Sequence, residues 1–166
     1  RIEQRHFAHL ACSKQTKNMI RTLFYQLAEA NRLAGRPADV PVRKYTRVGI
    51  LGAGMMGAGL AHVSALAGLQ VMLLDTTLDA AQKGKAYSQK ILDGDVVKGR
   101  MSADKRDKTL GLIEPTTDYT ALSACEIVIE AVFEDRAVKA EVTRRAEAAM
   151  APDAIFAFNT FTLPIT

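Results

Sequence analysis

Three glycines follow a short apolar run at a spacing that few folds can use. The run from Val48 to Leu51 precedes six residues with the pattern G-x-G-x-x-G, namely Gly52, Ala53, Gly54, Met55, Met56 and Gly57. From Met55 to about Ala67 the residues are small and apolar, as in a helix that packs closely on a sheet. The segment therefore predicts a strand, a tight turn and a helix, which begin a βαβ unit.

Each glycine of this turn has a separate physical role. Gly52 permits the tight turn, Gly54 lets the backbone approach a pyrophosphate, and Gly57 lets the helix pack against the strand. Phosphates would lie at the helix N-terminus, where free amides and the helix dipole favour negative charge. Asp75 ends the next predicted strand, where a carboxylate accepts hydrogen bonds from ribose hydroxyls and repels a 2′-phosphate. The combination predicts a dinucleotide site that favours NAD over NADP.

Other interpretations of the same turn remain. A Walker phosphate loop is excluded, because no G-K-[ST] follows the glycines. Folds that bind FAD or S-adenosylmethionine have similar turns and stay as competitors. Asp75 could also be an ordinary exposed carboxylate at the end of a strand.

Short β-branched runs alternate with helical stretches along the rest of the chain. This alternation is typical of an α/β fold, here a Rossmann-type doubly wound parallel sheet preceded by an N-terminal helical linker. Strands are predicted at 47–51, 70–74, around 112–114, 126–130 and 154–158, and helices at 55–67, 77–93, 102–111 and 136–150.

The first 44 residues are predicted to form a separate helical linker segment, and residues 45–166 are predicted to form the dinucleotide-binding domain. Apolar residues recur at helical spacing up to Leu33, with a break expected near Ser13, and the prolines between residues 35 and 41 end the helical pattern. Nine basic and three acidic residues lie in this segment. The basic residues are spread singly, so a solvated helix face is expected rather than a nucleic-acid site. Its apolar side chains are expected to pack on a partner; they include Phe7, Leu10, Ile20 and Phe24.

The chain shows no metal site and no convincing catalytic base. Cys12 and Cys125 lie far apart without a CxxC or Cys/His cluster, so reduced thiols and a cytoplasmic location are expected. His6, His9 and His62 are isolated histidines, and a general base needs an orienting partner. No apolar run approaches the roughly 20 residues of a membrane span.

Three stretches together make the chain recognisable: VGILGAGMMGAGLAHVSAL at 48–66, IVIEAVFEDRAVK at 127–139 and AFNTFTLPIT at 157–166. They resemble the 3-hydroxyacyl-CoA dehydrogenases, and most of all the multifunctional enzymes of fatty-acid β-oxidation. In those enzymes a helical linker joins an enoyl-CoA hydratase/isomerase domain, a lyase, to the dehydrogenase. Residues 15–41 look like that linker.

The resemblance implies specific contacts. NAD would contact the glycine turn with Met56, then Asp75, and then Val132, Phe133, Glu134 and Lys139 after the fourth strand. Coenzyme A would contact Ser88, with Lys98 as a looser candidate, and Asn159 would lie in the substrate site. Without the resemblance, Glu134, Lys139 and Ser88 would be taken as ordinary helix residues.

The chain departs from the family in two ways. The family usually has Ser-Asn-Thr-Ser where this chain has Phe158, Asn159, Thr160 and Phe161, and a phenylalanine at 161 cannot form the hydroxyl contact to substrate and nicotinamide. The family's catalytic histidine, its glutamate partner and its helical C-terminal domain would lie beyond residue 166. The isolated chain is therefore expected to bind NAD without turning over substrate.

Two functions follow from the resemblance and its departures. The first is the NAD-binding part of an enzyme that oxidises L-3-hydroxyacyl-CoA to 3-ketoacyl-CoA. Its parent would be dimeric or in a complex with a thiolase, and the N-terminal helices would pack on a hydratase domain. The second is a non-catalytic nucleotide-binding or interaction module whose substrate site is filled by Phe158 and Phe161.

Overall fold

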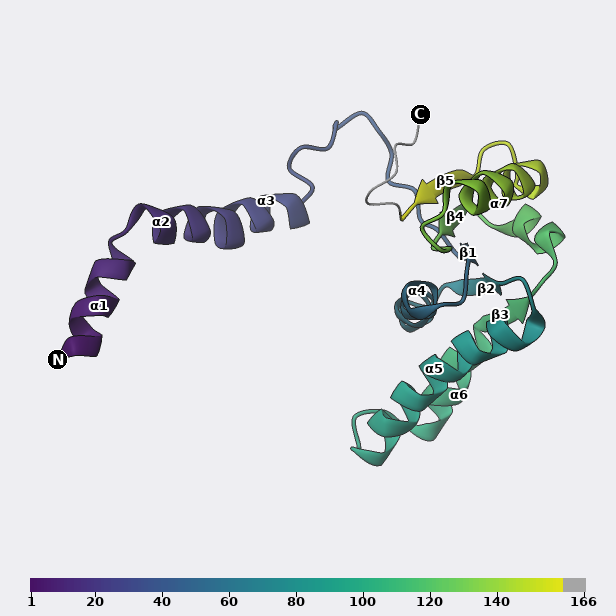
Figure 1. Ribbon diagram of the computed structural model, residues 1–166, viewed down its shortest axis with the longest axis horizontal. Helices are drawn as coiled ribbons and strands as arrows, with labels where there is room; N and C mark the ends of the chain where they lie inside the picture. The colour runs from purple at the N-terminus through teal and green to yellow at the C-terminus, as the bar shows by residue number, and fades with distance from the viewer. Residues whose placement is uncertain (160–166) are drawn as a thin grey trace. The chain divides into compact units, whose positions relative to one another are not determined.

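The computed structural model describes residues 1–159, and the chain divides into two compact units (Figure 1). The first unit is Arg1–Arg43 and the second is Lys44–Thr166.

The first unit is helical and has no hydrophobic core among its helices. It consists of α1 (Ile2–Ala11), α2 (Lys14–Ile20), a π-helical segment (Arg21–Gln26) and α3 (Leu27–Asn31). Ser13 is the N-cap of α2, and its hydroxyl accepts a hydrogen bond from the Thr16 amide. The break predicted near Ser13 is confirmed, whereas the π-helical turn was not predicted. No residue of these helices is buried within the unit.

The second unit is built on a parallel sheet of five strands in the order β3-β2-β1-β4-β5. The strands are β1 (Arg47–Leu51), β2 (Gln70–Leu74), β3 (Ile113–Thr116), β4 (Ile127–Glu130) and β5 (Ile155–Phe158). All four neighbouring pairs are parallel, with Leu51 beside Leu74 on one side and beside Glu130 on the other. The predicted doubly wound fold is confirmed.

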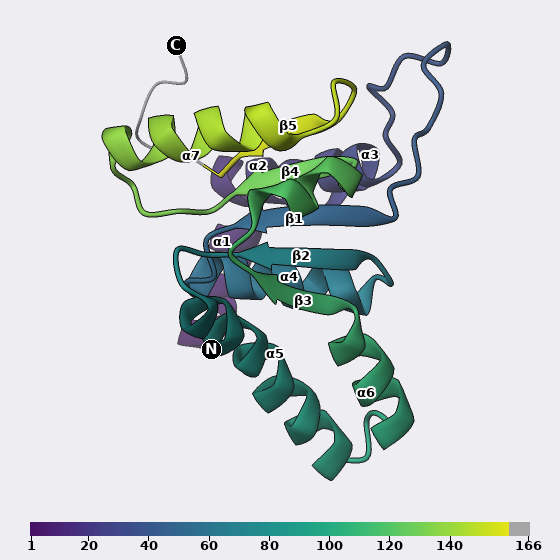
Figure 2. The same ribbon diagram turned by 90° about the vertical axis from the view of Figure 1, so that its right-hand side faces the viewer.

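Helices cover both faces of this sheet. Helices α4 (Met55–Leu66) and α5 (Leu78–Val97) lie on one side, and α7 (Arg136–Ala149) lies on the other (Figure 2). Helix α6 (Ala103–Gly111) packs along α5. Three of these helices have an N-cap residue whose side chain accepts a hydrogen bond from a backbone amide of the first turn: Thr77 for α5, Ser102 for α6 and Asp135 for α7.

Three local predictions differ from the structure. Helix α5 continues through Gly94 to Val97, and the left-handed residue that follows its end is Gly99, with φ of 67°. Strand β3 extends to Thr116 through Pro115, which is tolerated because β3 lies at the edge of the sheet that residues 1–159 form, beside β2. The 3-10 helix η2 (Tyr119–Ala124), which precedes β4, was not predicted.

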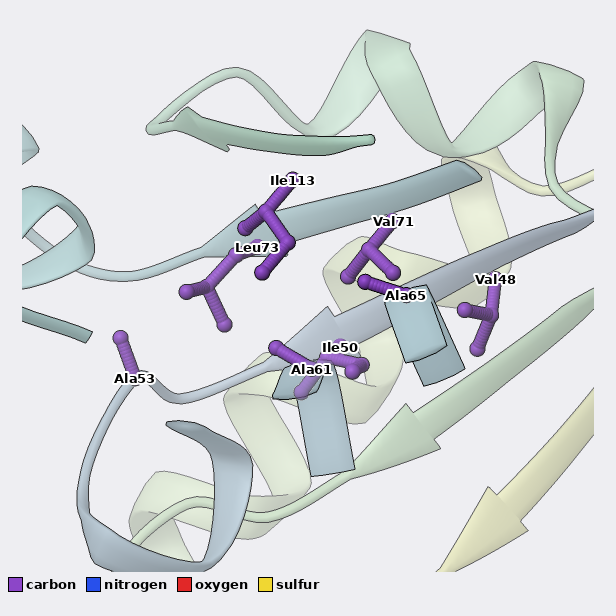
Figure 3. Close-up of a cluster of buried hydrophobic side chains, with 8 residues drawn as sticks. All are labelled: Val48, Ile50, Ala53, Ala61, Ala65, Val71, Leu73 and Ile113. Carbon is purple, nitrogen blue, oxygen red and sulfur yellow. The ribbon is translucent and has the colours of Figure 1, made fainter. Parts of the chain in front are cut away.

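The apolar core has one layer on each face of the sheet. The α4 side contains Val48, Ile50, Ala53, Ala61, Ala65, Val71, Leu73 and Ile113 (Figure 3). The α7 side contains Leu51, Leu74, Leu122, Cys125, Val128 and Ala146. Alanines on α4 bring its axis close to the sheet, which places the start of α4 directly behind the end of β1.

A carboxylate fastens the starts of β1 and β4 together. Glu126 accepts hydrogen bonds from the amides of Thr46 and Arg47 and from the Thr46 hydroxyl, at 2.5, 3.0 and 3.0 Å. The Thr46 amide, followed by the Arg47 amide and the Thr46 hydroxyl, lowers the pKa of Glu126.

This carboxylate should give the domain a measurable pH dependence. A lowered folded-state pKa contributes stability above the unfolded-state value, and that contribution disappears as the pH falls through the folded-state value. We expect Glu126→Gln to be less stable than the unchanged chain at pH 7, with the difference shrinking below about pH 4.5. Urea unfolding at pH 7 and at pH 3.5 measures this. If the free energy of unfolding fell by the same amount in both proteins between pH 7 and pH 3.5, this prediction would be wrong.

Candidate dinucleotide site

The glycine turn is shaped by contacts that admit no side chain at two of its positions. Gly52 has φ of 94°, and a Cβ added there would lie 2.7 Å from the carbonyl oxygen of Ala131. A Cβ on Gly57 would lie 1.7 Å from the carbonyl oxygen of Gly52. Both glycines are therefore required by the protein itself, the first for its backbone conformation and the second for the approach of α4.

Gly54 is different, because the protein does not require a glycine there. Its φ and ψ of −65° and −170° suit any residue, and a Cβ would meet nothing within 4 Å. The space above it is open, on the side where the turn precedes α4. A glycine without an internal reason at this position fits the close approach of a pyrophosphate.

The N-terminus of α4 has amides available for such a ligand. Gly54 is its N-cap and provides no side-chain hydrogen bond, unlike the capped starts of α5, α6 and α7. The first amides of a helix have no partner within the helix, so they can bind an anion. Met55 and Met56 follow Gly54 and are exposed at 82% and 53%, while Gly57 is buried. The turn thus fits the phosphates of a dinucleotide.

Asp75 lies beside the turn, at the end of β2. Its Oδ2 accepts a hydrogen bond from the Ala53 amide at 2.6 Å, and its Oδ1 accepts from the Thr76 amide at 2.6 Å and from the Thr76 hydroxyl at 3.1 Å. The side chain is half-buried. These contacts hold one carboxylate at the point where β1 ends, which is the geometry needed to receive the hydroxyls of a ribose.

A second set of predicted residues gathers at the ends of β4 and β5. Val132 is half-buried and Phe133 is 81% exposed, in the loop that touches Gly52. Asn159 is exposed, and its amide donates a hydrogen bond to the carbonyl of Glu130 at 3.0 Å. The glycine turn after β1 and the loop after β4 therefore lie side by side, at the carboxyl ends of these two strands.

Lys139 and Glu134 meet a carboxylate that sequence reasoning missed. The Nζ of Lys139 donates to both carboxylate oxygens of Glu130, at 2.9 and 2.8 Å, and lies 3.3 Å from Oε2 of Glu134. Glu130 also accepts a hydrogen bond from the Val132 amide at 2.8 Å. A signal was available in the sequence, since Glu130 is a charged residue at the end of the apolar run IVI.

The residues predicted to contact coenzyme A lie along α5, away from the carboxyl ends of β1 and β4. Ser88 is fully buried, and its hydroxyl has no hydrogen-bond partner among the described residues. Lys98 is exposed at the opposite end of α5 from Thr77, about 30 Å along the helix. A contact between Ser88 and coenzyme A stays a prediction, and it requires the buried hydroxyl to be uncovered.

Of the two positions at which the family usually has serine, 158 and 161, the structure describes the first. Phe158 is 38% exposed on β5, and its ring packs edge-on against Phe156 at 4.8 Å between ring centroids. Phe161 lies outside the described residues. The prediction that the two phenylalanines fill a substrate site therefore stays a prediction.

Neither His62 nor Cys125 is suited to acid–base or nucleophilic chemistry. The His62 side chain is half-buried, its Nδ1 has no hydrogen-bond partner among residues 1–159, and burial lowers the pKa of the ring. Burial raises the pKa of the Cys125 thiol to about 11, so it stays protonated at neutral pH. Within residues 1–159 no group of three or more His, Cys, Asp or Glu side chains is placed to hold a metal ion, and no helix is long and apolar enough to cross a membrane.

The fold and the site together define a dinucleotide-binding domain: a doubly wound sheet, a glycine turn at an uncapped helix start, and a ribose-type carboxylate after β2. The profile of the family described as "3-hydroxyacyl-CoA dehydrogenase, NAD binding domain" matches residues 47–166. The chain belongs to this family, and its cofactor is NAD.

Relatives of known name agree with this assignment. The fatty acid oxidation complex subunit alpha of Shewanella frigidimarina is 36% identical over 165 residues, which are 99% of this chain and 23% of that protein. The (S)-3-hydroxybutyryl-CoA dehydrogenase of Ralstonia eutropha is 34% identical with a TM-score of 0.71, over 74% of this chain and 44% of that one. The dehydrogenase part of multifunctional enzyme 1 from C. elegans is 26% identical with a TM-score of 0.65, over 84% and 34%. The chain thus spans about a quarter of the curated relative.

Proposed function

We propose that this chain is the NAD-binding part of an L-3-hydroxyacyl-CoA dehydrogenase, which oxidises 3-hydroxyacyl-CoA to 3-ketoacyl-CoA in fatty-acid oxidation. The observation that carries the proposal is the pairing of an unobstructed Gly54 at the start of α4 with the Asp75 carboxylate on the Ala53 amide. The family match over residues 47–166 supports the substrate class.

The residues of this chain bind and orient the cofactor in this proposal. The amides at the start of α4 receive the pyrophosphate, and Asp75 receives the adenine ribose. The loop after β4 and the side chains of Glu134 and Lys139 hold the nicotinamide half. NAD, when bound, accepts the hydride from the 3-hydroxyl carbon. The Nδ1 atom of His62 is buried, so proton removal from the hydroxyl is not assigned to it.

Substitution of Asp75 tests the cofactor assignment. Asp75→Ala should weaken NAD binding at least tenfold, because one good charge-assisted contact contributes about 1.5–3 kcal/mol. It should weaken NADP binding much less, since the carboxylate no longer repels a 2′-phosphate. Calorimetric titration of each protein with each nucleotide measures both effects, and circular dichroism verifies the fold. Equal loss for both nucleotides would contradict the ribose assignment, and turnover of a hydroxyacyl-CoA by the isolated chain would contradict its role as a binding part only.

We further propose that the parent is a multifunctional cytoplasmic enzyme whose hydratase domain, a lyase, receives the helices of the first unit. Phe7, Leu10 and Phe24 are exposed at 73%, 61% and 70%, which leaves apolar surface for a partner domain. The exposed free thiol of Cys12 suits a reducing compartment. The relative named as a complex subunit supports assembly, here proposed as a dimer or a complex with a thiolase. Size-exclusion chromatography of the full-length parent with and without a thiolase subunit tests the assembly.

A further inference from the structure

The carboxylate of Asp75 accepts three hydrogen bonds within residues 1–159. Its Oδ2 accepts one from the Ala53 amide at 2.6 Å, and its Oδ1 accepts one from the Thr76 amide at 2.6 Å and one from the Thr76 hydroxyl at 3.1 Å. An ionised carboxylate has about four lone-pair sites, two on each oxygen. The described residues therefore leave one site open on Oδ2, whereas they take both sites on Oδ1.

A ribose that binds through both of its hydroxyls needs a site on each oxygen. The 2′- and 3′-hydroxyls lie on adjacent carbons, so one carboxylate can accept a hydrogen bond from each of them, one on Oδ1 and one on Oδ2. If Asp75 receives the adenine ribose, as the proposed function states, one of the two donors on Oδ1 has to leave. The identity of that donor decides what ribose binding costs the protein.

The three protein donors are not equally easy to replace. Ala53 follows Gly52, whose amide donates to the Leu74 carbonyl at 2.7 Å, so the end of β2 holds this part of the turn in place. The Thr76 amide lies between β2 and Thr77, the N-cap of α5, so it is also fixed by its neighbours. The Thr76 hydroxyl, in contrast, belongs to an exposed side chain that turns about one bond, and its hydrogen bond is the longest of the three. The hydroxyl is therefore the donor that leaves.

We propose that Thr76 sets the affinity of the ribose site, because its hydroxyl occupies the position on Oδ1 of Asp75 that a ribose hydroxyl takes when NAD binds. Binding then exchanges one hydrogen bond to the carboxylate for another, so the second ribose hydroxyl adds little to the affinity. Without the competing hydroxyl, the full contribution of that ribose hydroxyl is recovered. For an exposed hydrogen bond, the gain is about threefold to tenfold in dissociation constant.

Thr76→Val tests the proposal on the intact chain, because valine keeps the shape of the side chain and the backbone amide and removes the hydroxyl. It should lower the dissociation constant of NAD⁺ about threefold to tenfold. The gain should disappear with at least one of two analogues, whose adenine ribose lacks the 2′- or the 3′-hydroxyl, because the hydroxyl that needs Oδ1 is then missing. Calorimetric titration of each protein with the three nucleotides measures the constants.

Two further variants control this comparison. Thr76→Ser keeps a hydroxyl at the same position and should return the dissociation constants toward those of the unchanged chain. Thr120→Val is the matched control, since the Thr120 hydroxyl also donates to an exposed carboxylate, that of Asp118, at 2.5 Å. Asp118 has no assigned part in the ribose site, so this variant should leave all three constants unchanged.

The outcomes separate this inference from the proposed function. Unchanged or weaker binding of NAD⁺ by Thr76→Val overturns the inference, and so does an equal gain with all three nucleotides. If Thr76→Val does not fold, Thr76→Ala removes the same hydroxyl and carries the test. Failure of the unchanged chain to bind NAD⁺, or equal binding of NAD⁺ by Asp75→Ala, would overturn the proposed function, and the inference would fall with it.

Discussion

Replacing Gly57 by alanine should lower the free energy of unfolding by about 3 kcal/mol, which corresponds to a fall of about 10 °C in Tm. The reason is a collision between backbone and side chain, since the new Cβ would lie 1.7 Å from the carbonyl oxygen of Gly52. Neither atom is the end of a flexible side chain. Relief requires α4 to move away from β1, which opens the packing of Ala61 and Ala65 against the sheet. Thermal unfolding followed by circular dichroism measures the change.

Two other glycines of the same segment are matched controls. Gly59→Ala places its Cβ in open space within α4, so it should be neutral or stabilise the chain by about 0.5–1 kcal/mol. Gly54→Ala also meets nothing in the protein and should leave Tm unchanged, yet it should weaken NAD binding at least tenfold, because the Cβ occupies the space of the pyrophosphate. If all three variants behaved alike, the distinct roles of Gly54 and Gly57 would be refuted.

These glycines also mark how far local sequence reasoning reaches. The turn, α4 and Asp75 are predictable because their geometry is local: each glycine acts on its own backbone or on the neighbouring helix. Gly49 shows the limit. A Cβ at this position would lie 2.6 Å from Cδ2 of Leu122, so glycine at position 49 leaves the space in which η2 packs closely on β1. Nothing near Gly49 in the sequence indicates that contact, and η2 was not predicted.

The site shows the same division between local and distant causes. Resemblance to a family predicted Glu134 and Lys139 as cofactor contacts, but not the buried partner of Lys139. Glu130 ends β4 and Lys139 lies near the start of α7. The two side chains come together because β4 and α7 contribute to the same core cluster. Helix α5 was predicted to end at residue 93, yet Gly94, Asp95 and Val96 remain half-buried in the helix, so tertiary packing outweighs the low helix propensity of glycine.

Removal of one charge from the buried ion pair between Glu130 and Lys139 should lower the free energy of unfolding more than removal of any other single charge considered. Lys139→Met keeps the volume of the side chain and removes the ammonium from a fully buried carboxylate, with distances of 2.8 and 2.9 Å in the unchanged chain. Breaking such a pair from one side costs about 3–5 kcal/mol, because the remaining charge must stay buried or take up a proton. Urea unfolding at pH 7 should show this loss.

An exposed pair on the same domain separates burial from ion pairing as the cause. Lys83 and Asp79 lie 2.7 Å apart on α5 with side chains 77% and 73% exposed, and Lys83→Met should change stability little, since water screens that pair. The double variant Glu130→Gln with Lys139→Met should regain part of the loss at pH 7, because no charge then remains buried without its partner. Similar small losses for Lys139→Met and Lys83→Met would show that water reaches Glu130.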